Sequence, residues 1–408
     1  MDRARFVSLR DDLQQQGIDV EAALQAIQAF MVETPSWGYG NSGTRFKVFP
    51  WPGAARTLFE KLDDAAMVQR VTGACPGVAI HIPWDRVDDW PGAEQHAASL
   101  GVHIGAVNPN LFQDDVYRLG SLCHPDAAVR RRAIDHVLEC IRIAEQVHSE
   151  VISLWLADGT NYPGQDDVRR RRHRLLDALQ EIYAAMPAGM RLLIEYKFFE
   201  PAFYQTDLPD WGTSLLCCQK LGPQAQVLVD TGHHPQGTNL AQIVAQLLDE
   251  GRLGGFHFND RKYADDDLIV GSLNPFELFT IFHEILAARD EGNTNVAQIA
   301  YMIDQSHNIE PKIEAMIQSI VHIQLAYAKA LLVDQQALAR AQEAGDVLGA
   351  YRVLRAAFET DVRPLLAEAR IRQGLDPDPI AAFRQSGYAE RVASERALAT
   401  VTSGYPGA

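Results

Sequence analysis

The stretch that decides the fold runs from residue 190 to residue 232 and reads MRLLIEYKFFEPAFYQTDLPDWGTSLLCCQKLGPQAQVLVDTG. It begins with the apolar run 190–197, continues through a helical pattern at 211–222, and ends with a second apolar run at 225–232. Short runs of aliphatic and β-branched residues are typical of strands buried on both faces of a parallel sheet. Two such strands joined by a helix form the repeating unit of an α/β protein, so this stretch predicts a parallel sheet covered by helices.

The same alternation extends over most of the chain in both directions. Further strands are predicted at 30–37, 77–84, 101–110, 150–159, 254–260 and 296–304, with helical patterns between most of them. Together with the two runs above they make eight strands, and eight strand–helix units predict a closed (β/α)8 barrel, the TIM barrel. We expect a helical segment at 3–29 to precede it.

The last quarter of the chain has a different character. From Pro311 onward it shows helical patterns and no strand signal, and residues 313–327 place apolar side chains along one helix face. We therefore expect a barrel domain at 1–310 and an all-helical extension at 311–408. The extension could simply cover the outside of the barrel, but apolar stripes beyond a closed barrel favour an arm that contacts other copies of the chain.

Composition and charge narrow the range of partners. The 408 residues carry a formal net charge of -16, whereas nucleic acids and anionic membranes bind clustered Lys and Arg. The one basic block, Arg169 to Arg172, falls in a helical pattern and is predicted to be a solvated helix face. The five cysteines lack CxxC spacing, which favours small core residues, such as Cys217 and Cys218, over a zinc–thiolate site. Since no stretch approaches the ~18 apolar residues of a membrane span, we expect a soluble, cytoplasmic protein without a nucleic-acid or membrane partner.

Several of the predicted strands end abruptly in residues that can bind a metal ion. The run 190–197 ends with Glu195 and Lys197, which point to one face of the strand and can address one substrate together. The run 225–232 delivers Asp230, and His233 follows a glycine turn. A buried strand that ends in a charged group needs a partner for that charge, because an unpaired buried charge costs several kcal/mol. Since the strand ends of a barrel meet at one edge, a shared divalent cation would satisfy them together.

The last two strands and the loop between them add further ligands. The run 254–260 contributes His257, the loop behind it carries the acids Asp265 to Asp267, and the run 296–304 ends with Asp304. The predicted metal ligands are thus Glu195, Asp230, His233, His257, Asp265, Asp267 and Asp304. Carboxylates and imidazoles without thiolates favour Mn²⁺, Mg²⁺, Co²⁺ or Zn²⁺. So many ligands exceed what one cation needs, and they predict two cations bridged by a carboxylate.

Each of these residues has a structural interpretation as well. A lone histidine at a strand end is more often a hydrogen-bonded core residue, and an aspartate there commonly caps the next helix, which is the alternative for Asp260 and Asp266. The metal prediction depends on the set, because capping alone rarely explains so many consecutive strand ends. We expect His234, His307 and Asn259 to hold the ligands in orientation.

At these residues the chain resembles the L-rhamnose isomerase family within the xylose-isomerase-like TIM barrels. The resemblance is carried by PSWGYGNSGTRF, HIPWD, LWLADGTNYPGQ, EYKFFEPAFY, LVDTGHH, GGFHFND, KYADDDL and MIDQSHN, which span about residue 33 to 310. It implies an aldose–ketose isomerase that converts L-rhamnose to L-rhamnulose and accepts other sugars, such as D-allose (to D-psicose) and L-mannose. It also implies two divalent cations per subunit, Mn²⁺ foremost, and a homotetramer whose helical extension contacts its neighbours.

The resemblance also implies roles for individual residues. It assigns a structural cation to Glu195, Asp230, His257 and Asp304, with Glu195 as the bridge, and a second, catalytic cation to His233, Asp265 and Asp267. It assigns substrate handling to Lys197 and His81, and hydrophobic walls to Trp37 and Trp155. Related sequences often have a histidine where this chain has Tyr196, which strand alternation points away from the site.

Two routes for the reaction follow from these residues. A hydrogen moves between C1 and C2 of the sugar either as a metal-promoted hydride or as a proton through an enediolate. Lys197 would stabilise negative charge on a sugar oxygen, Asp304 or a metal-bound water would shuttle the hydroxyl proton, and His81 would assist ring opening. The rival interpretations are a ketose 3-epimerase, a dinuclear TIM-barrel metallohydrolase and a sugar-binding module without catalysis.

Overall fold

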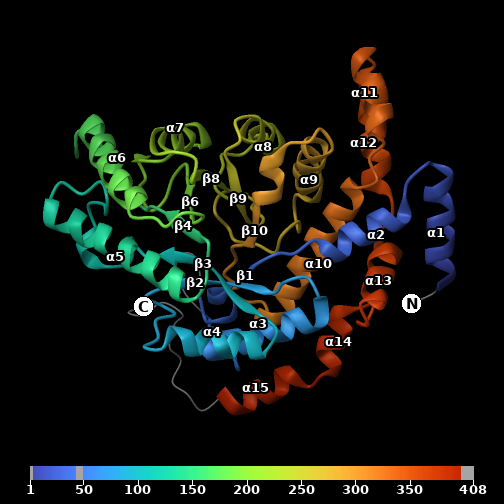
Figure 1. Ribbon diagram of the computed structural model, residues 1–408, viewed down its shortest axis with the longest axis horizontal. Coiled ribbons are helices and arrows are strands. Elements are labelled where there is room, and N and C mark those ends of the chain that lie inside the picture. The colour runs from blue at the N-terminus through green and yellow to red at the C-terminus, as the bar shows by residue number, and fades with distance from the viewer. Residues whose placement is uncertain (1–2, 43–48, 397–408) are drawn as a thin grey trace.

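Eight parallel strands form a closed barrel at the centre of the molecule (Figure 1). The computed structural model describes residues 3–42 and 49–396. In order around the sheet the strands are β1 (Thr34–Pro35), β2 (Gly77–Ile82), β3 (His103–Pro109), β4 (Val151–Trp155), β6 (Arg191–Glu195), β8 (Ala225–Asp230), β9 (Leu253–Phe258) and β10 (Ala300–Ile303). The barrel closes at Glu33, whose backbone N–H donates to Tyr301 O at 2.8 Å and whose carbonyl accepts from Ile303 N at 2.9 Å. The predicted TIM barrel is therefore confirmed.

One helix follows each strand of the barrel and packs on its outside. These helices are α3 (Leu58–Thr72), α4 (Trp90–Ser99), α5 (Ala127–Gln146), α6 (Val168–Ala184), α7 (Trp211–Leu221), α8 (Leu240–Asp249), α9 (Pro275–Asp290) and α10 (Lys312–Ala330). Most begin at an Asp or Asn whose side chain accepts from a backbone N–H of the first turn, for example Asp126 from Ala128 N and Asp210 from Thr213 N. The ring closes because α10 packs against both α9 and α3.

The remaining helices lie outside this ring, most of them at one side of the barrel (Figure 1). They are α1 (Arg3–Gln15), α2 (Val20–Ala29), α11 (Gln335–Glu343), α12 (Val347–Glu359), α13 (Arg363–Arg372), α14 (Pro379–Gln385) and α15 (Tyr388–Arg396). Helix α13 packs on α1 and α2, while α11 and α12 rise away from the barrel as a column (Figure 1). The helical extension begins as predicted, but its first helix, α10, takes the eighth place in the barrel ring, so the division at 310/311 separates that helix from its strand.

Side chains inside the barrel alternate in layers along the strands, as the two-residue period of a strand requires. A middle layer of six apolar or aromatic residues fills the interior: Trp37, Ala79, Ala106, Leu193, Leu228 and Met302. Two positions further along four of the strands come His81, Glu195, Asp230 and Asp304. The apolar layer therefore forms the floor on which the polar residues of the C-terminal end lie.

Three local details differ from the sequence-based predictions. Helix α4 was not foreseen, and only Trp90, Ala93 and Ala97 of it are buried, which is too few for a clear apolar period. The predicted strand 30–37 is reduced to β1, because Ser36–Tyr39 turns into the 3-10 helix η1. The last strand is shorter than predicted because Thr294–Gln298 forms another 3-10 helix.

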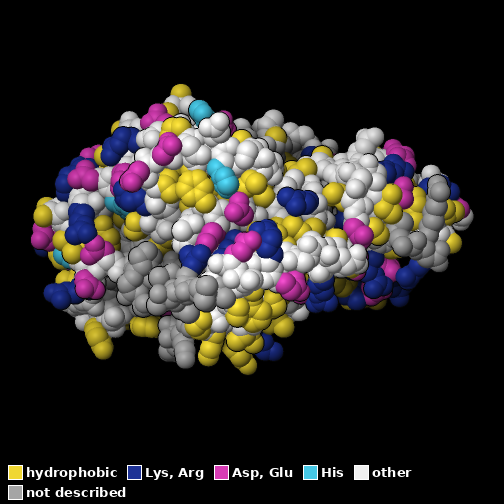
Figure 2. Space-filling view, turned by 90° about the horizontal axis from the view of Figure 1, so that it is seen from below, with side chains coloured by type: hydrophobic (Ala, Val, Ile, Leu, Met, Phe, Trp, Pro, Cys, Tyr) yellow, Lys and Arg dark blue, Asp and Glu magenta, His cyan; other side chains and the backbone are white. Residues whose placement is uncertain are grey.

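Charged side chains of both signs are interspersed on the face that Figure 2 shows. Charged side chains of the C-terminal helices form ion pairs: Arg384 of α14 lies 2.9 Å from Glu314, and Arg391 of α15 lies 3.0 Å from Glu395. Among the described residues no single helix is long and apolar enough to cross a bilayer. Only α10 and α11 together pass that length and composition test, bent by 61°.

Candidate metal centre

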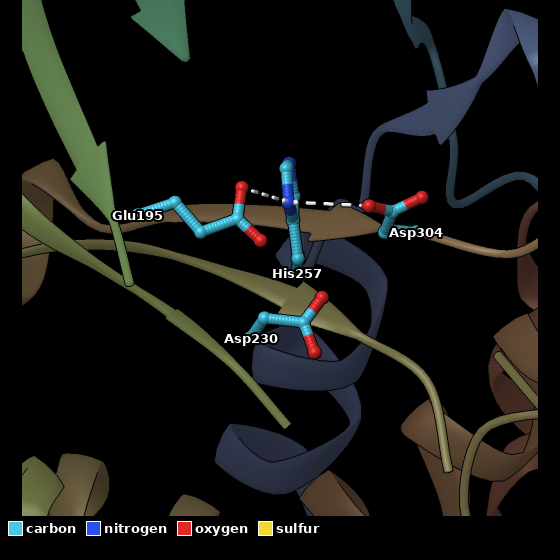
Figure 3. A group of neighbouring side chains, drawn as sticks. All are labelled: Glu195, Asp230, His257 and Asp304. Carbon is cyan, nitrogen blue, oxygen red and sulfur yellow. Dashed lines mark ion pairs between the residues drawn. The ribbon is translucent and has the colours of Figure 1, made fainter. Parts of the chain in front are cut away.

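Four predicted ligands meet at the C-terminal ends of the strands. Glu195 and Asp230 end β6 and β8, and His257 lies one residue before the end of β9. Asp304 comes directly after β10. Each of the four offers one ligand atom, and these atoms all lie within 4.8 Å of one another. Figure 3 shows the side chains gathered around His257, whose Nδ1 is 3.2 Å from Glu195 Oε2 and 3.5 Å from Asp304 Oδ2.

The cluster concentrates negative charge in a buried place. Burial raises the pKa of Asp230 above its usual range, and the neighbouring Glu195 acts in the same direction. Burial also raises the pKa of Asp304. For Glu195 the imidazoles of His257 and His233 outweigh the effect of burial and lower the pKa of the carboxyl. A divalent cation here would stabilise all three carboxylates in their charged form.

The donor atoms fit a cation in kind as well as in position. Neither ring nitrogen of His257 makes a hydrogen bond within residues 3–42 and 49–396, and Nδ1 is the one that faces the carboxylates. Buried polar atoms of a folded protein are nearly always hydrogen-bonded, so such atoms point to a ligand. Three carboxylates and one imidazole are a donor set that Mn²⁺, Mg²⁺, Co²⁺ and Zn²⁺ all accept.

A second group of ligands adjoins the first. It consists of Asp230, His233 and Asp265, whose ligand atoms again lie within 4.8 Å of one another. Nε2 of His233 is 3.4 Å from Asp265 Oδ1, while Nδ1 is 3.0 Å from the carbonyl oxygen of Tyr196 and 3.1 Å from Glu195 Oε1. Asp230 is common to both groups, and Oε1 of Glu195 also faces His233 of the second group, so the bridging role that the resemblance implied for Glu195 stays a prediction. The two groups are adjacent and share the carboxylate of Asp230.

The three aspartates of the loop after β9 make different contacts. Asp265 belongs to the second ligand group, but Asp267 belongs to neither group that the described residues form. Its carboxyl instead shares a hydrogen bond with Asp265, and burial together with that neighbour raises the pKa of Asp267. Asp266 accepts from the backbone N–H groups of residues 262 and 263 at 2.7 and 2.8 Å. Asp260 accepts from Leu273 N at 2.7 Å and from Asn274 N at 2.9 Å, just before α9, so the capping interpretation fits Asp260, whereas Asp266 binds N–H groups of the loop and caps no helix.

Lys197 brings a positive charge to the second group. Its Nζ donates to Asp265 Oδ2 at 2.6 Å and lies 3.8 Å from a carboxylate oxygen of Glu200. The same atom lies 5.3 Å from the ring centre of Trp155, within range of a cation–π interaction. Burial opposes the charged form of Lys197, but Asp265 outweighs it and raises the pKa of the ammonium. Lys197 is therefore protonated and fixed beside Asp265.

Aromatic side chains form the opposite side of the site. Trp37 donates from Nε1 to Asp304 Oδ1 at 2.8 Å. Its ring lies edge-on to the ring of His81, with 5.6 Å between the two ring centres. His81 stacks on Trp84 at 3.9 Å, and Trp155 contacts Phe112 at 4.8 Å. Burial lowers the pKa of His81 well below its usual value, so its imidazole is neutral near pH 7. The predicted Trp37, His81 and Trp155 all line this wall, whereas Trp84 and Phe112 were missed.

Of the three residues expected to orient ligands, Asn259 contacts a predicted ligand directly. Asn259 donates from Nδ2 to both carboxylate oxygens of Asp230 at 3.0 Å. His234 lies 2.6 Å from the hydroxyl of Tyr196, the residue before Lys197. His307 is 3.2 Å from the carbonyl oxygen of Gly38 and contacts no predicted ligand among the described residues.

One further cluster has a structural explanation. Cys123, Asp158 and Asp207 also gather at ligand distance. Asp158 accepts from the backbone N–H groups of Ser121 and Cys123, and Asp207 forms an ion pair at 2.7 Å with Arg171. Arg171 is fully buried, so the prediction of a solvated helix face for Arg169 to Arg172 is wrong at this residue. The arginine compensates the acids that a cation would otherwise bind.

A closed (β/α)8 barrel with carboxylates, imidazoles and a lysine at the C-terminal strand ends defines a class of proteins, the metal-dependent TIM-barrel enzymes. The pattern of the xylose isomerase-like TIM barrel family matches residues 83–288 of this chain. A probable sugar isomerase of Rhizobium meliloti (strain 1021) is 46% identical over 396 residues, which is 96% of this chain and 92% of that protein. A second probable sugar isomerase, from Mesorhizobium japonicum, is 44% identical over 98% of this chain and 94% of its own length. The chain belongs to the xylose isomerase-like TIM barrel family.

More distant relatives agree with this assignment. An L-rhamnose isomerase of Rhodopirellula baltica is 27% identical over 225 residues, which is 48% of this chain and 52% of that protein. A solved structure of an L-ribulose 3-epimerase superposes with a TM-score of 0.56 at 14% identity and covers 78% of this chain and 98% of that one. At this identity the likeness shows the shared fold. The L-rhamnose isomerase family in particular stays a prediction.

Proposed function

We propose that the protein is a metal-dependent aldose–ketose isomerase that converts L-rhamnose to L-rhamnulose and accepts related sugars, such as D-allose and L-mannose. The observation that carries the proposal is Lys197, a buried ammonium 2.6 Å from Asp265 at the edge of the second ligand group. A binding module would need neither this lysine nor two ligand groups. The names of the relatives, two probable sugar isomerases and an L-rhamnose isomerase, support the same reaction class.

We propose two divalent cations, Mn²⁺ foremost, as cofactors. Glu195, Asp230, His257 and Asp304 would hold one, and His233, Asp265 and Asp267 with Asp230 would hold the other. When bound, the cations polarise a carbonyl and lower the pKa of neighbouring hydroxyl groups, which is what isomerisation at C1 and C2 requires.

The chain's own side chains supply the rest of the chemistry. The Lys197 ammonium would donate to the sugar oxygen on which negative charge develops, and its contact with Asp265 holds it in place beforehand. Asp304, fixed by the indole N–H of Trp37, would move the hydroxyl proton. The neutral imidazole of His81 can accept a proton from a ring hydroxyl and so assist ring opening. Trp37 and Trp155 would exclude water from the reacting carbons.

The direct test is a substrate panel. Protein stripped of metal and reconstituted with Mn²⁺ is incubated with L-rhamnose, L-mannose and D-allose, and ketose is measured. Ketose from at least one aldose, and none with Lys197→Met at unchanged metal content, would support the proposal. A protein that binds Mn²⁺ but forms ketose from no aldose, or that interconverts ketoses at C3 instead, would contradict it.

A labelled substrate separates the two routes of hydrogen transfer. With deuterium at C2, a hydride shift keeps the label in the ketose, whereas proton transfer through an enediolate releases it to solvent. We expect retention, because the buried Trp37 and the half-buried Phe112 and Trp155 limit the access of water to the reacting carbons. Substantial wash-out would exclude the hydride shift.

The assembly of the protein is proposed on separate grounds. Helices α11 and α12 project from the barrel, and Val347, Leu348 and Tyr351 of α12 are exposed there. We propose that the helical extension after residue 310 contacts other copies of the chain in a homotetramer. Light scattering of the full chain would test this, with Leu348→Glu in the same helix as the variant expected to weaken assembly.

A further inference from the structure

A buried ion pair lies directly behind the aromatic wall of the site. Nζ of Lys61, in α3, donates to Asp85 Oδ1 at 2.6 Å, and the two side chains are 3% and 0% exposed. Lys61 comes from the helix after β1, and Asp85 lies in the turn after β2. The pair therefore sits where the ends of the first two strands meet.

The second oxygen of Asp85 connects both of these strand ends. Oδ2 accepts from the backbone N–H of His81 at 2.8 Å and from the hydroxyl of Ser36. Ser36 precedes Trp37 in η1, and the backbone N–H of Asp85 donates in turn to the carbonyl of His81 at 2.9 Å. One carboxylate thus holds the residue before Trp37 and the backbone of His81 at the same time.

The directions of these bonds matter more than the energy of the pair. A buried ion pair is generally no more stabilising than a well-packed apolar pair of the same size, because both charges must leave water. A carboxylate, however, accepts several hydrogen bonds in defined directions, which an apolar side chain cannot do. Lys61 occupies Oδ1, so Oδ2 is directed toward Ser36 and His81.

We propose that Asp85, oriented by Lys61, is a positioning residue that sets the placement of Trp37 relative to His81 and thereby the fit of the sugar. This rests on the proposed function, since it assumes that the wall contacts a sugar. Asp85 touches neither ligand group, so its effect passes through the contact of the two rings at 5.6 Å and through the bond from Trp37 to Asp304.

The chain offers a matched control on the same helix. Asp64, three residues after Lys61 in α3, forms a buried pair at 2.8 Å with Arg396 of α15, and the side chains are 2% and 6% exposed. Asp64 also accepts from the hydroxyl of Tyr388 at 2.7 Å. This pair resembles Lys61–Asp85 in burial and chemistry but faces the C-terminal helices instead of the site.

The experiment compares Lys61→Met/Asp85→Asn with Asp64→Asn/Arg396→Met. Removing both charges together avoids leaving one of them buried and unpaired, so both double variants should fold. The readouts are the indole ¹⁵N–H resonance of Trp37, assigned with Trp37→Phe, and KM and kcat with the best sugar of the panel. We expect the first variant to shift the Trp37 resonance and raise KM about tenfold with a smaller change in kcat, and the control to change neither.

An unchanged Trp37 resonance in Lys61→Met/Asp85→Asn would overturn the proposal, as would an unchanged KM. An equal change in the control would overturn it too, because the effect would then be general loss of stability. If the wild-type protein turns over no sugar, the proposed function fails, and the indole resonance alone still decides whether Asp85 positions Trp37.

Discussion

The polar side chains at the two ends of the barrel interior differ in whether they find hydrogen-bond partners within the protein. At the N-terminal end of the strands, Nη1 of Arg191 donates to Gln226 Oε1 at 3.1 Å and to Gly254 O at 3.2 Å, and Glu33 accepts from Ala106 N at 2.9 Å. At the C-terminal end, neither ring nitrogen of the buried His257 makes a hydrogen bond in the part of the chain that the structure describes. The difference teaches that the protein completes one end by itself and needs a ligand at the other.

The largest expected effect comes from Asp265→Ala at the C-terminal end. The variant removes a ligand of the second group and the partner of Lys197, so kcat/KM should fall by about 10³-fold or more, since a metal ligand supports several kcal/mol of transition-state stabilisation. The variant should still fold, but with a lower thermal midpoint, because the buried ammonium of Lys197 loses its partner. The matched control is Asp266→Ala, whose carboxylate accepts from N–H groups of the loop and belongs to neither ligand group of the described residues. A fall of the same size in both variants would contradict the comparison.

Removal of metal from the ligand groups at the C-terminal end should lower the free energy of unfolding. Three carboxylates crowd around His257 there, and a ligand that binds only the folded state at 1,000 times its Kd adds about 4 kcal/mol to the free energy of unfolding. The thermal midpoint should therefore fall with EDTA and recover with Mn²⁺. Glu195→Gln should abolish most of the recovery. A midpoint that does not respond to metal would show that this end, too, is complete without a ligand.

At the N-terminal end, Arg191→Met should act on stability alone. The change leaves the acceptors Gln226 Oε1 and Gly254 O without their donor, and the free energy of unfolding should fall by about 2–3 kcal/mol. Urea unfolding measures the loss, and KM for the sugar should not change. A variant with normal stability and an altered KM would break the distinction between the two ends.

The smallest effect is expected from Glu33→Gln, and it depends on pH. Burial raises the pKa of Glu33 from 4.5 to about 7, so the folded protein holds a proton there that the unfolded chain releases. This group's contribution to stability is therefore full below about pH 4.5 and is lost as the pH rises toward 7. The glutamine variant should be more stable than the wild type by about 1–3 kcal/mol at pH 8, with a smaller difference at pH 5. Equal differences at both pH values would contradict the assignment.

The strand ends were predictable because their information is local. Glu195, Asp230 and Asp304 each end an apolar run, and the two-residue period of a strand predicts that they face inward with the layer below them. The same reasoning predicted the barrel from the eight alternations. The sequence did not predict that Asp230 belongs to both ligand groups, because this depends on how strands far apart in the chain are placed around the barrel axis.

Contacts between residues far apart in the chain could not be predicted from the sequence. Glu33 reaches past β2 to the backbone of β3, and a Cβ at Gly105 would lie 1.7 Å from its Oε2, so only glycine leaves the space. Arg171 looked like one arginine in a basic run, yet Asp207, far along the chain, draws it into the interior. Phe112 belongs to the aromatic wall but lies in a loop, where no repeating pattern of apolar residues marks it. Such residues are determined by tertiary partners and not by their neighbours in the chain.

The shortness of β1 has a consequence for the motion of the barrel. The strand pairs with β2 only at Thr34 and Pro35, and beyond these the ring closes through the backbone of Glu33. So short a ladder makes this seam a part of the barrel that local fluctuation can open. Its amides, such as Glu33 N–H, should exchange with deuterated water sooner than those of β6, which pairs along its whole length with β4. The chain then continues from the seam into Trp37, so local opening of this seam would move one wall of the site.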